Sequence, residues 1–270
     1  MRLAYYSVAA REEFWTEHWG GHSVDELLAA ARTSPLTRLI LESLPPRGRV
    51  LEAGCGLGQY VLLLRERGIP AAGADWSVEA LAACRRVAPV PVAAMDLAAL
   101  ALRDGSFAAY VSLGVVEHDA AGPDAILAEA RRVLAPGGTL VVSVPYVTGV
   151  RWLATPYLRR RARAVAGRGG AFYQYAFSRA ELHAALRRHG FVVRSTRPYD
   201  PGRILRTALR RLVSARRRIG SASGVPSETP GPGVPRGARG TAGRALRALL
   251  YTRPSLGLFG HMLLAVAAKA

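Results

Sequence analysis

The sequence predicts an α/β fold in which a mostly parallel sheet carries helices on both faces. Short apolar runs alternate with segments of helical spacing from about residue 49 to residue 144, a pattern typical of parallel sheets. A glycine-rich turn follows the first of these runs, between a strand-like and a helix-like segment. The chain has 270 residues, 50% of them hydrophobic, which suffices for one large domain with additions.

Residues 1–45 are expected to form a helical extension before the core. Residues 25–32 and 37–44 have helical spacing, and Pro45 with Pro46 ends this part because proline disfavours helical backbone in the residue before it. The core is predicted over residues 46–200 and 254–270. Its strands are expected at 49–53, 70–74, 90–94, 107–113, 139–144, 191–196 and within 257–268, and its helices at 59–67, 77–87, 124–134 and 178–189.

Residues 201–253 are predicted to be an insert between the last two strands. The stretch from Arg203 to Arg218 places apolar residues on one helical face and arginines on the other. Residues 220–243 are rich in glycine, proline, serine and threonine, a composition typical of a disordered linker.

Charge is divided unevenly along the chain. Residues 1–150 hold 13 arginines and 16 acidic residues, whereas residues 151–253 hold 23 arginines and three acidic residues. Such asymmetry favours an anionic partner such as nucleic acid, an acidic membrane surface or an anionic substrate. The chain uses arginine almost exclusively over lysine. A compositional preference of this kind explains why the basic residues are arginines, but it does not explain why residues 151–253 contain so few acidic residues.

The most informative motif is V-L-E-A-G-C-G-L-G-Q-Y, from Val50 to Tyr60. Glycines at alternate positions after a strand let a ligand approach the backbone, because glycine has no Cβ and tolerates positive φ. A dinucleotide fingerprint has the spacing G-x-G-x-x-G. Here the third glycine comes one residue earlier and a carboxylate, Glu52, precedes the loop, which suits a cationic ligand rather than a pyrophosphate.

This motif resembles motif I of the class I S-adenosylmethionine-dependent methyltransferases of the small-molecule type. Asp75 and Asp96 end the next two predicted strands, and Ser112 to Asp119 (S-L-G-V-V-E-H-D) resembles the family's motif IV. The resemblance covers about residues 48–146. It implies a Rossmann-like, three-layer fold whose seven-stranded sheet is mostly parallel with an antiparallel last strand, and N-terminal helices that act as a lid.

The resemblance also implies a site for S-adenosylmethionine at the carboxyl ends of the strands. Asp75 would accept hydrogen bonds from both ribose hydroxyls, Trp76 would pack on the adenine, and Asp96 would accept from the adenine amino group. The full set implied is Glu52, Ala53, Gly54, Cys55, Gly56, Gly58, Asp75, Trp76, Met95, Asp96, Leu97, Leu113, Gly114 and His118.

Methyl transfer from a sulfonium needs mainly the alignment of nucleophile, methyl carbon and sulfur. A base is needed only if the nucleophile is protonated at neutral pH, and His118 is the best candidate by type, with Tyr146 second; ordering of a loop is the alternative role for His118. Two aromatic clusters are candidates for the pocket of a small-molecule acceptor. They comprise Tyr5, Tyr6, Phe14, Trp15 and Trp19, and Phe172 to Tyr175.

Three other functions remain as alternatives. A nicotinamide-dependent oxidoreductase would need the dinucleotide spacing, and a nucleic-acid methyltransferase would need an acceptor motif such as N/D-P-P-Y after the fourth strand, where this chain has S-L-G-V. A non-catalytic binding module would not need Glu52, Asp75 and Asp96 together. No metal is expected.

The compartment and the role of the basic stretch are further expectations. Cys55 and Cys84 are too few for a disulfide framework, and no run reaches the ~20 apolar residues of a membrane span, so we expect a cytoplasmic protein. The stretch from Arg203 to Arg218 is interpreted as a helix packed on the domain, as a peripheral membrane contact, or as a nucleic-acid contact, in that order.

Overall fold

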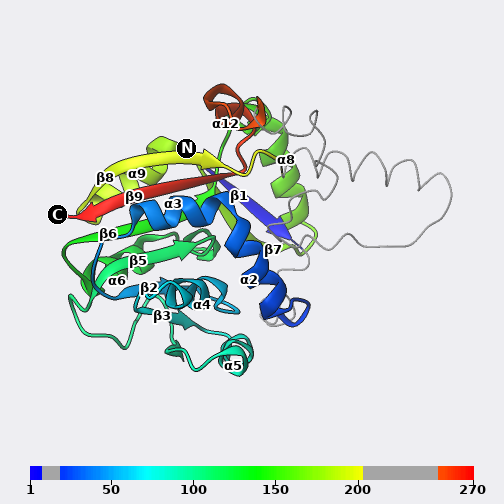
Figure 1. Cartoon of the computed structure of the whole chain (residues 1–270). Helices are drawn as coiled ribbons and strands as arrows, with labels where there is room; N and C mark the ends of the chain where they lie inside the picture. Colours follow the sequence, from blue (N-terminus) through cyan, green and yellow to red (C-terminus); the bar gives the residue numbers. More distant parts are fainter. Residues whose placement is uncertain (8–18, 203–248) are drawn as a thin grey trace.

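The computed structural model describes residues 1–7, 19–202 and 249–270 (Figure 1). Its main sheet has seven strands in the order β4-β3-β2-β5-β6-β9-β8. Strand β9 runs antiparallel to both of its neighbours, β6 and β8, and the other pairs are parallel. The predicted mostly parallel sheet with an antiparallel last strand is confirmed. The strands are β2 (Val50–Ala53), β3 (Ala71–Asp75), β4 (Val92–Ala94), β5 (Phe107–Leu113), β6 (Leu134–Pro145), β8 (Phe191–Tyr199) and β9 (Met262–Lys269).

Helices cover both faces of this sheet and complete the three layers (Figure 1). One face packs against α2 (Val24–Thr33), α3 (Pro35–Ser43), α4 (Gln59–Glu66) and α5 (Val78–Val87). The other packs against α6 (Asp124–Val133) and α9 (Arg179–Arg188). Each helix buries an apolar stripe, and α4 also buries its central run Val61 to Leu64. The two hydrophobic cores therefore lie on opposite sides of the sheet.

The first residues depart from the expected helical extension. Strand β1 (Arg2–Ser7) pairs antiparallel with β7 (Ala171–Phe177) in a second, two-stranded sheet. Leu3 of β1 is buried with Ala176 and Val147. The prediction of helix was wrong here because the partner of β1 lies about 170 residues away in sequence, beyond the reach of local periodicity.

Three helices near the carboxyl side of the sheet were not predicted. They are α7 (Gly149–Leu153), α8 (Thr155–Ala166) and α12 (Arg253–Phe259). The last strand, expected within 257–268, lies at Met262–Lys269. It follows the short helix α12, which has Pro254 in its first turn, where proline is favoured. A short 3₁₀ helix, η1 (Val116–His118), follows β5.

Several expectations fall on residues outside the described part of the chain. These are the basic stretch from Arg203 to Arg218, the linker 220–243, and the aromatic residues Phe14 and Trp15. Within the described residues, no helix is long and apolar enough to cross a membrane.

Candidate functional site

The glycine-rich loop joins β2 to α4 and needs glycine at each of its three positions. The φ angles of Gly54, Gly56 and Gly58 are +79°, +52° and +70°, a region that residues with a Cβ adopt only at a cost. A Cβ on Gly56 would lie 2.4 Å from Cζ2 of Trp19, and one on Gly54 would lie 2.3 Å from a methyl group of Val115. The loop therefore lies in close contact with both the N-terminal segment and the end of β5.

Asp75, at the carboxyl end of β3, holds this loop in place. Its Oδ2 accepts a hydrogen bond from the Gly56 N–H at 2.7 Å, and its Oδ1 accepts one from the Ser77 N–H at 3.0 Å. The side chain is 5% exposed, and burial raises the pKa of its carboxyl, although these backbone N–H groups oppose the shift. Each carboxylate oxygen has a further lone pair for a ligand hydroxyl.

Glu52 lies beneath the loop rather than on its open side. Its Oε2 accepts a hydrogen bond from the Val61 N–H at 3.0 Å, so it ties β2 to the first turn of α4. The side chain is 2% exposed, and burial raises the pKa of its carboxyl well above the usual value. The structure thus gives Glu52 an internal hydrogen bond, and direct contact with a ligand stays a prediction.

The ends of β3 and β4 bring the predicted adenine-binding residues to one edge of the sheet. The Met95 N–H donates to the carbonyl of Asp75 at 3.0 Å. Trp76 is 53% exposed, so its ring is available to a ligand. Asp96 is exposed and accepts from the Ala98 N–H at 2.9 Å, whereas Met95 and Leu97 pack partly against the core.

The remaining predicted residues of the loop and of β5 would contribute mostly backbone atoms to the site. The N–H groups of Gly54 and Cys55 both donate to the carbonyl of Ala74, at 2.8 and 3.1 Å, and Ala53 is fully buried. Gly114, next to the half-buried Leu113, has φ +74°. Cys55 and Cys84 are buried free thiols whose pKa burial raises, so neither is a reactive thiolate.

His118 links η1 to β7. Its Nδ1 lies 2.7 Å from the carbonyl oxygen of Tyr173, and the two rings meet edge to face at 5.3 Å. A carbonyl only accepts, so Nδ1 carries the proton and Nε2 is the basic nitrogen of the neutral ring. Tyr146 lies half-buried after β6, where its carbonyl accepts from Arg151 Nη1 at 2.6 Å.

Glu117, which precedes His118, is the residue that sequence reasoning did not select. It is 1% exposed, and Oε2 accepts no hydrogen bond from the residues that the structure describes. Its Oε1 lies 3.6 Å from the position that a Cβ on Gly114 would take. Burial raises the pKa of this carboxyl to about 8. The E-H pair in the sequence was the available signal, but nothing in it distinguished a buried glutamate from an exposed one.

Some residues of the two predicted aromatic clusters contact one another, and others lie elsewhere. Tyr6 of β1 and Phe172 of β7 contact edge to face at 6.1 Å, and Phe172 contacts Tyr175 at 4.6 Å. Trp19 lies apart from them, on the glycine loop. The aromatic residues therefore lie at two places near the carboxyl side of the sheet.

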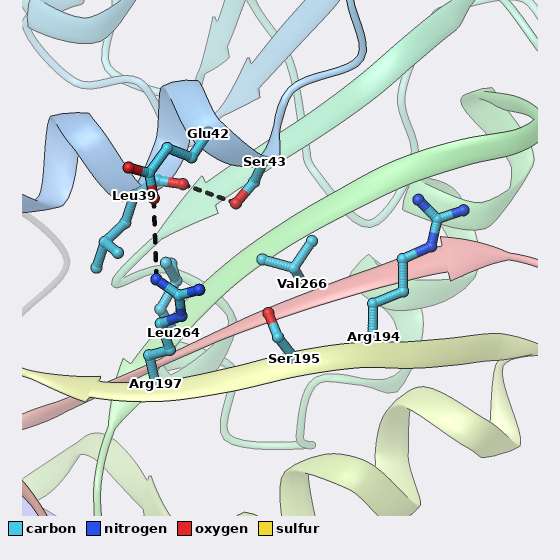
Figure 2. A pocket seen from close by; sticks show the side chains of 8 residues that line it. All are labelled: Leu39, Glu42, Ser43, Arg194, Ser195, Arg197, Leu264 and Val266. Atoms are coloured by element: carbon cyan, nitrogen blue, oxygen red, sulfur yellow. Dashed lines mark hydrogen bonds and ion pairs between the residues drawn. The ribbon is translucent and has the colours of Figure 1, made fainter. Parts of the chain in front are cut away.

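A groove of about 210 Å³ lies between α3 and the strands β8 and β9, away from these residues (Figure 2). The ion pair of Glu42 and Arg197, 3.8 Å apart, spans it. None of the predicted site residues lines it. Its lining consists of Leu39, Glu42, Ser43, Arg194, Ser195, Arg197, Leu264 and Val266.

Comparison with known proteins agrees with this geometry. Residues 51–142 match the family described as methyltransferase domain. A demethylmenaquinone methyltransferase of Renibacterium salmoninarum is 31% identical over 154 residues, 54% of this chain and 64% of the relative. A protein of the same name from Thermus thermophilus is 39% identical over 111 residues, 38% of this chain and 49% of the relative. The chain thus spans less than two thirds of these curated relatives.

Solved structures share the fold at low sequence identity. A SAM-dependent methyltransferase from Archaeoglobus fulgidus aligns with TM-score 0.56 and 18% identity, over 96% of this chain and all of that one. Residues 51–142 thus match a methyltransferase domain, and the fold of the whole described part agrees with that of S-adenosylmethionine-dependent methyltransferases.

Proposed function

We propose that this protein transfers the methyl group of S-adenosylmethionine to a small molecule of apolar or lipid-like character. The observation that carries the proposal is the bond between Asp75 and the glycine loop. The 2.7 Å hydrogen bond from the Gly56 N–H to the buried carboxylate fixes the conformation of the loop, and Trp76, the residue after Asp75, is exposed. A ligand with a ribose and a planar base fits such a donor and acceptor set.

Particular residues would hold the cofactor at the ends of β2, β3 and β4. Asp75 would accept from the ribose hydroxyls, Trp76 would cover one face of the adenine, and Asp96 would bind its amino group. The backbone of Gly54, Gly56 and Gly114 would pass beside the methionine part. When bound, the cofactor supplies a methyl group already activated on a sulfonium, so the chain needs chiefly to orient the acceptor.

The acceptor is proposed to bind beside β5 and η1. His118, held by the carbonyl of Tyr173, would accept a proton there if the acceptor carries one. Glu117 is mostly protonated at pH 7, because its pKa is about 8, so it would bind a polar group of the acceptor rather than act as the base. Tyr146 is a second candidate for this role. The contact of Trp19 with Gly56 supports a lid formed by the N-terminal segment, which would exclude water.

An aromatic or lipid-like acceptor is supported by two observations. The side chains of Tyr6, Phe172 and Tyr175 form a series of ring contacts on β1 and β7, and β7 is the strand whose Tyr173 carbonyl contacts His118. Both curated relatives described above are named demethylmenaquinone methyltransferases. An acceptor with a planar ring and apolar substituents matches both.

Calorimetry with S-adenosylmethionine and with NAD tests the donor side of the proposal. Binding of S-adenosylmethionine alone is expected, and binding of NAD alone would overturn it. Release of S-adenosylhomocysteine in the presence of naphthoquinols and phenols then tests catalysis. If the protein binds S-adenosylmethionine but releases no S-adenosylhomocysteine with any of these acceptors, the result would favour the alternative of a non-catalytic binding module.

A further inference from the structure

An exposed apolar surface lies beside the carboxyl edge of the sheet, outside the proposed methyl-transfer site. In α7, Trp152 is 63% and Leu153 73% exposed, and in α8 Tyr157 is 64% exposed. Large side chains of these kinds rarely protrude together from a protein surface unless they meet a partner. We call this the α7–α12 surface; it consists of Val150, Trp152, Leu153, Tyr157, Leu258 and Phe259.

The helices that carry these residues contact one another in the order α12, α7, α8. A Cβ on Gly149 would lie 2.9 Å from Cδ2 of Leu258, so the start of α7 packs tightly on α12. Helix α7 also contacts α8, and α8 lies at the same end of the molecule as α12 (Figure 1). The inner side of α8 is used for packing on β1 through Leu158. Its outer side and the protruding residues of α7 therefore face outward.

The surroundings of this surface are strongly basic. Residues 151–180 contain seven arginines and no acidic residue. Arg159, Arg160 and Arg163 are exposed on α8, within two turns of Tyr157. Exposed tryptophan, tyrosine and leucine next to several arginines is the combination that binds the interface of an anionic bilayer, where rings and aliphatic groups enter the headgroup region and arginines meet lipid phosphates.

The surface is also fixed in position next to the proposed active site. Arg151 of α7 donates from Nη1 to the carbonyls of Tyr146 and His261, at 2.6 and 3.2 Å. These carbonyls lie at the carboxyl end of β6 and just before the start of β9. A bilayer docked on α7 would therefore lie beside the edge of the sheet where the acceptor is proposed to bind.

We propose that the α7–α12 surface docks this protein on membranes that contain anionic lipids. Charge selects this occupant over two others. A second copy of the chain would bring the same arginines to the contact, and the chain's own stretch from Arg203 to Arg218 holds seven arginines and no acidic residue, so both would be repelled. Nucleic acid would satisfy the arginines, but it offers no apolar layer to Leu153 and Leu258.

Vesicle co-sedimentation with the full chain tests the proposal. Vesicles of phosphatidylcholine with 30% phosphatidylglycerol, a composition on the order of natural anionic membranes, are compared with phosphatidylcholine alone. We expect binding to the anionic vesicles that weakens as salt is raised. Absence of binding to the anionic vesicles would overturn the proposal.

Two variants with matched controls locate the contact. The double variant W152S/L153S should bind at least about tenfold more weakly because it removes two apolar side chains from the bilayer interface. The exposed Val192→Ser in β8 should leave binding unchanged. Neutralising Arg159, Arg160 and Arg163 to Gln should weaken binding by on the order of 100-fold. The control is a triple variant with Gln at the exposed Arg67, Arg86 and Arg103. It has the same net charge as the first triple variant, and its vesicle binding should weaken much less.

The outcomes separate this proposal from its rivals and from the proposed function. Vesicle binding by W152S/L153S equal to that of the unchanged protein would overturn the role of this surface. Tighter binding to duplex DNA than to vesicles, lost in the arginine triple variant, would assign the surface to nucleic acid instead. Thermal unfolding checks that each variant is folded. S-adenosylmethionine binding measured on the same samples is independent of this surface, so loss of vesicle binding alone leaves the methyltransferase proposal intact.

Discussion

Two buried carboxylates lie at the carboxyl ends of β3 and β5, the strands on either side of β2, and they differ in the hydrogen bonds that they accept. Asp75, the last residue of β3, accepts a hydrogen bond from a backbone N–H on each of its carboxylate oxygens. Glu117, after β5, leaves Oε2 without a hydrogen bond from the described residues although the side chain is as deeply buried. An unsatisfied buried polar atom costs about 1–3 kcal/mol. The proposed donor side of the site therefore has its hydrogen bonds in place before a ligand binds, whereas the proposed acceptor side contains a buried polar atom that a ligand would satisfy.

The largest expected effect is on the prebuilt side. Replacing Asp75 by Ala removes the proposed ribose acceptor and leaves the Gly56 and Ser77 N–H groups unpaired. Since hydrogen bonds to a charged group contribute about 1.5–3 kcal/mol each, affinity for S-adenosylmethionine should fall by roughly 1000-fold in calorimetry. Asp75→Asn keeps the shape and should lose less; equal affinity in all three proteins would remove the ribose assignment.

The pH dependence of the free energy of unfolding should report on the buried carboxyl group of Glu117. The folded-state pKa of Glu117, about 8, lies above its ordinary value of 4.5, so the folded state retains a proton that the unfolded state has released. Stability is therefore highest below about pH 4.5 as far as this group is concerned, and it falls as pH rises to about 8. At about 1.4 kcal/mol per pKa unit, the expected loss is about 5 kcal/mol in urea unfolding.

The variant Glu117→Gln isolates this contribution. It should flatten the pH dependence between these limits, although Glu52, whose pKa burial also raises, retains its own part. The variant should also reduce turnover more than it reduces affinity for S-adenosylmethionine. A pH profile of stability that matches that of the unchanged protein would show that Glu117 is ionised and paired in solution.

A substitution at Gly56 tests how closely Trp19 of the N-terminal segment packs against the glycine-rich loop. Gly56→Ala adds a Cβ at positive φ and within 2.4 Å of Trp19, whereas Gly68, with φ +76°, has no heavy atom within 4 Å of the added Cβ. Both variants cost about 1–2 kcal/mol for the backbone, and Gly56→Ala should cost a further ~1–3 kcal/mol for the overpacked contact. Thermal or urea unfolding measures this difference.

A second substitution identifies the origin of that additional cost. Trp19→Ala in the background of Gly56→Ala should recover most of it. Equal destabilisation by Gly56→Ala and Gly68→Ala would instead mean that Trp19 does not lie on the loop in solution.

Trp76 should give the smallest effect. Its ring is 53% exposed, so Trp76→Ala should change stability by less than about 0.5 kcal/mol. Stacking of a base on an aromatic ring contributes about 1–3 kcal/mol, which predicts roughly tenfold weaker binding of S-adenosylmethionine. Unchanged affinity would place the adenine elsewhere along this edge of the sheet.

Much of the donor side was predictable because its signals are local. Strand β5 was predicted with the bounds observed, and Ser77, the first residue of the helix predicted at 77–87, caps α5 by accepting from the Ala80 N–H at 3.2 Å. The three loop glycines do take positive φ. The internal hydrogen bond of Glu52 to the Val61 N–H was not predictable, because a motif specifies a residue type but not the direction of its side chain; contact of Glu52 with a ligand stays a prediction.

The sequence by itself determined the alternation of strands and helices, the glycine loop and the acidic residues at the strand ends, since periodicity, caps and turn residues act over a few positions. Only the tertiary structure decided the pairing of β1 with β7, the placing of Trp19 on Gly56, the burial of Glu117 and the exposure of Trp152 and Leu153. Each of these depends on which distant segments pack together, and burial, with the pKa shifts that follow from it, exists only once they do.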